Sequence, residues 1–94
     1  MTAAPIVTLF REWQAAKSAE KAVCAITDDE DETDRAWLVR YEVEKRLMRE
    51  PSRDAREWML KLCAWTNFGD TDAPNAQESP QLWAEARALV GVST

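Results

Sequence analysis

The chain has 94 residues, a formal charge of −5 and 46% hydrophobic residues, which is the composition of a single folded domain over residues 1–94. It contains no histidine and only two glycines, Gly69 and Gly91. Without imidazole there is no Ser-His or Cys-His nucleophile pair and no histidine metal ligand. Two isolated glycines cannot form a phosphate-binding loop. We therefore expect no enzyme activity, no metal and no cofactor.

The two cysteines, Cys24 and Cys63, form no CxxC motif and no disulfide framework. Both have apolar neighbours, and we interpret them as buried structural thiols. No basic segment followed by an apolar run opens the sequence, and no apolar run approaches the ~20 residues of a membrane span. These features predict a cytoplasmic protein that has no contact with a membrane.

Apolar side chains recur at alternating spacings of three and four through the first part of the chain, at Ile6, Leu9, Trp13, Ala16 and Val23. This spacing predicts one long helix over residues 5–27 with a heptad-like face, interrupted by Glu20. Pro5 suits the first turn of such a helix, where its missing N–H costs nothing.

Residues 28–33 are dominated by carboxylates and contain no apolar side chain. Repulsion between like charges and the lack of anything to bury predict a solvated loop at 28–33, with Thr33 or Asp34 capping the next helix. A calcium loop of the EF-hand type does not fit. Its sixth position would be Asp34 where glycine is needed, and its twelfth would be Arg40 where glutamate is needed.

The second predicted helix, residues 34–50, has two apolar stripes. One stripe contains Trp37, Leu38, Tyr41 and Met48, and the roughly opposite one contains Val39, Val43 and Leu47. A helix with two apolar stripes packs on two neighbours, and in so short a chain the second neighbour can be another copy of the protein. We therefore expect a homodimer, with an ordinary four-helix bundle as the alternative explanation of both stripes.

Pro51 breaks the helical pattern, so a third helix is expected over 53–67, although a kinked continuation of the second helix would also fit. Gly69 is placed to end the third helix, and a polar loop follows at 69–79. Ser79 and Pro80 then indicate a fourth helix over 80–90, ended by Gly91. The expected fold is all-α, a small helical bundle with a long antiparallel helical hairpin and two shorter helices.

Each predicted helix carries at least one of the five tryptophans. In a domain this small most indoles belong in the core, but tryptophan is also enriched at binding hot spots. Trp65 and Trp83 are the candidate partner-binding anchors, since each lies beside the loop 69–79. The acidic residues are the candidate specificity element: Asp28, Asp29, Glu30, Asp31 and Glu32.

Arginines recur at spacings of three and four around Pro51, at Arg46, Arg49, Arg53 and Arg56. Such a stripe could follow a phosphate backbone. Carboxylates are interleaved with it, however, which is typical of a solvated, ion-paired helix surface, so nucleic-acid binding is disfavoured.

The segment Pro5–Trp13, the acidic connection that follows, the sequence Leu47–Pro51 and the final Ser79–Val90 segment together resemble a loose group of small, uncharacterised all-helical bacterial proteins, many of them encoded among prophage genes. The resemblance implies a helical fold and brings no activity and no functional residues. The leading hypothesis is a non-catalytic protein–protein interaction or assembly module. The alternative is a small acidic inhibitor of a nucleic-acid-handling enzyme, acting as a phosphate mimic or as a steric plug.

Overall fold

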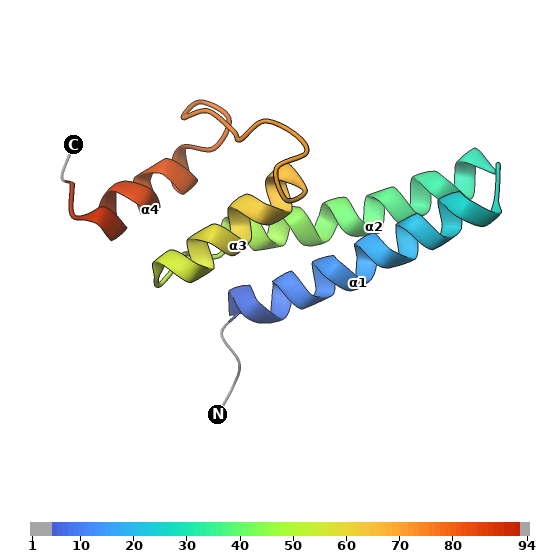
Figure 1. The fold of residues 1–94 in the computed structure, drawn as a ribbon, viewed down its shortest axis with the longest axis horizontal. Coiled ribbons are helices and arrows are strands. Elements are labelled where there is room, and N and C mark those ends of the chain that lie inside the picture. The colour runs from blue at the N-terminus through green and yellow to red at the C-terminus, as the bar shows by residue number, and fades with distance from the viewer. Residues whose placement is uncertain (1–4, 93–94) are drawn as a thin grey trace.

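The computed structural model describes residues 5–92, which fold into four α-helices and no strand. The helices are α1 (Pro5–Ile26), α2 (Glu30–Arg49), α3 (Ala55–Thr66) and α4 (Pro80–Val90). The first two form a long antiparallel hairpin, α3 packs against the open end of that hairpin, and α4 packs on α3 (Figure 1). The molecule is flat, with extents of 49 × 35 × 17 Å. The predicted fold, an all-α bundle built on a long hairpin, is confirmed.

The apolar core lies at the open end of the hairpin, where α3 covers it. It is formed by the buried residues Ile6, Leu9, Phe10, Trp13, Val43, Leu47 and Ala64. Those from α1 fall on the predicted heptad-like face, apart from Phe10, which lies beside it. Those from α2 belong to only one of the two predicted stripes. The other stripe is therefore left outside the core.

A polar network holds the two hairpin helices together beyond the core. The guanidinium of Arg40 lies 2.6 Å from a carboxylate oxygen of Glu20 on α1 and 2.6 Å from one of Glu44 on α2. The indole Nε1 of Trp13 donates to the same Glu44 oxygen at 2.8 Å. Burial alone lowers the pKa of Arg40, but the two carboxylates outweigh it and raise that pKa, so the guanidinium stays charged. The polar interruption at Glu20 is thus an interhelical ion pair.

The second helix begins four residues before the predicted position 34, so the predicted loop 28–33 and the predicted cap at Thr33 or Asp34 were wrong. Asp29 is the N-cap, and its side chain accepts a hydrogen bond from the backbone N–H of Asp31. Three carboxylates lie in the first turn of α2. Negative charge there is favoured by the positive end of the helix dipole, which offsets the repulsion on which the prediction relied.

The chain leaves α2 before Pro51, so the predicted break is confirmed and α2 and α3 are separate helices. Asp54 caps α3 by accepting from the backbone N–H of Glu57. The helix ends at Thr66, where Asn67 is the C-cap with a left-handed φ of 51°. The prediction that Gly69 fills this role was wrong, since asparagine tolerates the left-handed conformation.

The joint between α3 and α4 is polar and buried. Lys61 is fully buried, and its Nζ lies 2.7 Å from Oε1 of Glu85 and 2.8 Å from the carbonyl oxygen of Glu50. The hydroxyl of Ser52 donates to the same Glu85 oxygen at 2.7 Å. A buried charge is tolerated when it is paired and hydrogen-bonded in this way. These contacts link α4 to α3 and to the turn around Pro51.

Both cysteines are free thiols, and Cys24 is exposed on α1 while Cys63 is half-buried. The interpretation of Cys24 as a buried structural thiol was therefore wrong, because the outer half of α1 contacts only α2. Between residues 5 and 92, no helix has the length and apolar character needed to cross a membrane. The sequence predicted that no leader segment opens the chain. This prediction rests partly on residues 1–4, which lie outside the described residues.

Candidate interaction surface

A pair of stacked aromatic rings lies exposed on α2. Trp37 and Tyr41 are one helical turn apart, with ring centroids 5.0 Å apart and an interplanar angle of 11°. Their exposed fractions are 44% and 40%. The ammonium of Lys45, one turn further on, lies 5.0 Å from the centre of the Tyr41 ring, within reach of a cation–π interaction.

The stacked pair lies on the side of α2 that the core does not use. At 3.6 residues per turn, the positions of Trp37 and Tyr41 are about 120° around the helix from the positions of Val43 and Leu47. Val43 and Leu47 face α1 and α3 and are buried. The rings stay exposed because they lie on a side of α2 that the buried core does not cover, although α3 reaches the hollow beside Tyr41.

A hollow of about 310 Å³ continues the stacked pair toward α3. Tyr41 and Met48 of α2 and Trp65 of α3 form its apolar walls, and the charged side chains that line it are Glu44, Lys45 and Arg49. Glu44 is already bound to Arg40 and Trp13, and Lys45 pairs with Glu42 at 2.8 Å, so the charged group of this hollow that forms no ion pair among residues 5–92 is Arg49. We call Trp37, Leu38, Tyr41, Met48 and Trp65 together the aromatic surface.

The structure places Trp65, one of the two predicted anchors, in this surface with an exposed fraction of 36%. Trp83 has a different environment. Its Nε1 donates to the carbonyl oxygen of Pro74 at 2.8 Å, and its ring packs edge-on against Trp58 at 5.6 Å between centroids. Trp83 is half-buried and ties the long loop to α4, so its contacts are those of a structural residue.

The predicted acidic element lies at the closed end of the hairpin, far along α2 from Trp65 (Figure 1). Asp28, Asp29, Glu30, Asp31 and Glu32 are all exposed. Within residues 5–92, none of these carboxylates forms an ion pair. The structure therefore brings the predicted acidic residues together with one another, and separates them from both predicted tryptophans.

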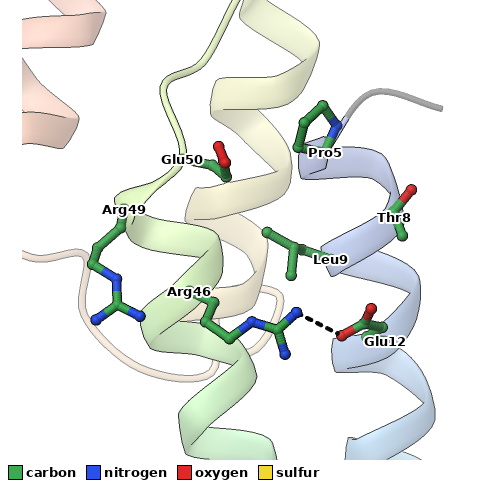
Figure 2. A pocket seen from close by; sticks show the side chains of 7 residues that line it. All are labelled: Pro5, Thr8, Leu9, Glu12, Arg46, Arg49 and Glu50. Carbon is green, nitrogen blue, oxygen red and sulfur yellow. Dashed lines mark ion pairs between the residues drawn. The ribbon is translucent and has the colours of Figure 1, made fainter. Parts of the chain in front are cut away.

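A second, larger hollow of about 630 Å³ lies between the start of α1 and the end of α2 (Figure 2). Its walls are both polar and apolar, and an ion pair between Glu12 and Arg46 crosses it at 3.3 Å. Arg53, also in the predicted arginine stripe, pairs with Glu57 at 3.0 Å. Arg46 and Arg53 thus agree with the expected ion-paired surface, whereas Arg49 and Arg56 form no ion pair among residues 5–92. In the part of the chain described, no cluster of metal-ligating side chains is present.

Trp37 and Tyr41 are not among the partner-binding residues predicted from the sequence. The available signal was the second apolar stripe of α2, which predicted a second neighbour and named both residues. In the structure, that stripe has no neighbour over its first half within residues 5–92.

Comparison of the chain with models of known protein families, with curated proteins and with solved structures finds no match. The fold and the surface thus define the class of protein: a small all-α bundle with an exposed aromatic face on its hairpin.

Proposed function

We propose that this chain is a non-catalytic interaction module that binds a protein partner through the aromatic surface. The observation that carries the proposal is the stacked pair of Trp37 and Tyr41, exposed to 44% and 40% and continuous with the hollow beside Trp65. Aromatic side chains seated beside a pocket are the residues that most often dominate binding energy at protein interfaces.

The composition of the surface supports a protein partner over a small polar ligand. Its walls are aromatic or thioether groups, which bury large apolar areas and adapt to a second surface. Charged groups stand around these walls, as at the rim of an interface, with Lys45 and Arg49 providing positive charge. Exposed apolar patches of this kind mark interaction sites in soluble proteins.

The proposal is tested by affinity capture from the native cell lysate, with and without nuclease, read by mass spectrometry. The test variant carries Trp37→Ser, Tyr41→Ser and Trp65→Ser. The matched control carries Ile26→Ser, Val39→Ser and Val90→Ser, three apolar side chains that lie outside the surface and are more exposed than the test residues. We expect a stoichiometric, nuclease-resistant partner with the wild type and the control and its loss with the test variant. Equal capture by all three proteins would contradict the proposal.

We propose, as a second candidate, a small acidic inhibitor of a nucleic-acid-handling enzyme. The exposed and unpaired carboxylates gathered at the closed end of the hairpin favour it, since they could occupy a basic groove. Replacing Asp28, Glu30, Asp31 and Glu32 by their amides, with the N-cap Asp29 kept, would abolish such inhibition. Inhibition that survived this change would exclude the mimic form.

A further inference from the structure

The residues on the exposed side of α2 are spaced symmetrically about the middle of the helix, and the sign of the charge is reversed between the two halves. Acidic residues lie at its start and basic residues at its end, with apolar residues between them: Glu30, Asp34, Leu38, Tyr41, Lys45 and Arg49. Successive members are four, four, three, four and four positions apart, so all six lie on one side of the helix. Reversing the order leaves the spacing unchanged and exchanges acids for bases.

An antiparallel copy of the same helix would match this side residue for residue. Leu38 would face Tyr41, Asp34 would face Lys45, and Glu30 would face Arg49, each pair occurring twice. The two residue numbers in every pair add to 79, so a single two-fold axis generates all of them. A parallel pairing would instead place acid against acid and base against base, which is unfavourable.

We propose that α2 of one chain packs antiparallel on α2 of a second copy, in this register. The proposal rests on the proposed function, because it names the occupant of the aromatic surface. Charge complementarity favours a second copy, because the acidic half of this side of α2 would face the basic half of the same side in the other chain. Among residues 5–92, Glu30, Asp34 and Arg49 form no ion pair within one chain, so their charges are free for this contact. Lys45 pairs with Glu42 in an exposed ion pair, and in the dimer it would exchange this partner for Asp34 of the second copy.

The same register fills the hollow beside Trp65. In an antiparallel pair, residues 41–49 of one helix face residues 30–38 of the other. The hollow is lined by Tyr41, Met48 and Trp65, and it would receive Trp37 of the second copy from the same side of the helix pair. Both stacked rings and both hollows would then be buried, and acid–base pairs would surround them, as in an interface with an apolar centre and a polar rim.

Charge reversal tests the register directly. Variant A carries Glu30→Lys and Asp34→Lys, and variant B carries Lys45→Glu and Arg49→Glu. Each alone would place like charges against one another at both ends of the interface. We expect sedimentation equilibrium at low salt to give twice the 10.7 kDa chain mass for the wild type, and a dimer Kd raised about tenfold or more for A and for B.

Two further experiments test the register: mixing variants A and B, and combining all four substitutions in one chain. An equal mixture of A and B should form a heterodimer, and a chain with all four reversals should dimerise as the wild type does. The matched control, Asp28→Lys with Glu32→Lys, makes the same charge change at the same end of the hairpin but outside this face, and should leave the dimer intact. Loss of the dimer in this control to the same extent as in A, or failure of A and B to pair, would overturn the register.

A wild-type chain that stays monomeric up to about 100 µM would overturn self-association. That result would leave the proposed function standing if a different protein were captured from lysate and lost with the Trp37, Tyr41 and Trp65 substitutions. A dimer that survives those three substitutions would overturn both the inference and the proposed surface.

Discussion

The Nζ of Lys61 lies 2.7 Å from Oε1 of Glu85, and this ion pair joins α3 to α4. Lys61 is fully buried and Glu85 is nearly so. Two further hydrogen bonds, from Ser52 and Gln81, hold the carboxylate in place. The position of the fourth helix thus depends on a buried polar contact as well as on the apolar packing of Leu82.

Removing one partner of this pair should be costly. Glu85→Ala leaves the Lys61 ammonium with only the Glu50 carbonyl, and we expect a loss of about 3 kcal/mol in the free energy of unfolding. The double variant Lys61→Met, Glu85→Leu replaces both charges by apolar groups and should lie within about 1 kcal/mol of the wild type. Urea unfolding measures both, and a double variant as unstable as Glu85→Ala would contradict this account.

Stability should fall at acidic pH through the same carboxylate. Burial alone raises the pKa of Glu85, but hydrogen bonds from Lys61, Gln81 and Ser52 outweigh it and lower that pKa below its usual value. A group with a lowered folded pKa stabilises the fold fully above its unfolded pKa of about 4.3, and loses this contribution as the pH falls through the folded value. The Glu85→Gln variant should therefore show a shallower loss of unfolding free energy between about pH 5 and pH 3. Parallel pH profiles would argue against the assignment.

Only one member of the acidic run should matter strongly for folding. Asp29 caps α2 and its carboxylate accepts from Asp31 N–H, so Asp29→Ala should cost about 1 kcal/mol. The neighbouring Asp28 has no such role, and Asp28→Ala is the matched control, expected within about 0.5 kcal/mol of the wild type. Thermal unfolding of the two variants provides the comparison, and equal effects would mean that Asp29 does not act as the cap.

Iodide quenching should distinguish the tryptophans. Trp37 and Trp65 have exposed fractions of 44% and 36%, whereas Trp13 has 1%. At protein concentrations low enough to keep the chain dissociated, Trp37→Phe and Trp65→Phe should each remove part of the quenchable fluorescence. The Trp83→Phe variant should leave most of it, because that indole packs on Trp58 and donates to Pro74. Iodide that quenches none of the five would contradict the exposed surface.

The helices could be predicted from the sequence because their signals are local. The three-four spacing of α1, the break at Pro51, and Ser79-Pro80 before α4 each act within a few residues. The start of α2 was misplaced because carboxylates are typical both of solvated loops and of the first turn of a helix. Only the hydrogen bond from Asp31 N–H to the Asp29 side chain distinguishes the two.

The surface could be predicted only in part, because the exposure of a tryptophan depends on distant segments. Trp83 is covered by Pro74 in the long loop and by Trp58 of α3. Trp37 stays exposed because α3 is short and ends beside the other half of α2. The stripe that contains Trp37 was recognised, but periodicity along one helix cannot show where the next helix stops.

Oxidative footprinting of the assembled protein tests the central claim most directly, because tryptophan, tyrosine and methionine side chains are readily oxidised by hydroxyl radicals. The account predicts that assembly protects Trp37, Tyr41, Met48 and Trp65, whichever protein covers the aromatic surface. Met59, exposed to 51% on α3 and outside the surface, should be oxidised equally with and without assembly. Protection of Met59 while Trp37 and Tyr41 stay fully reactive would contradict the claim that the aromatic surface is where this protein binds.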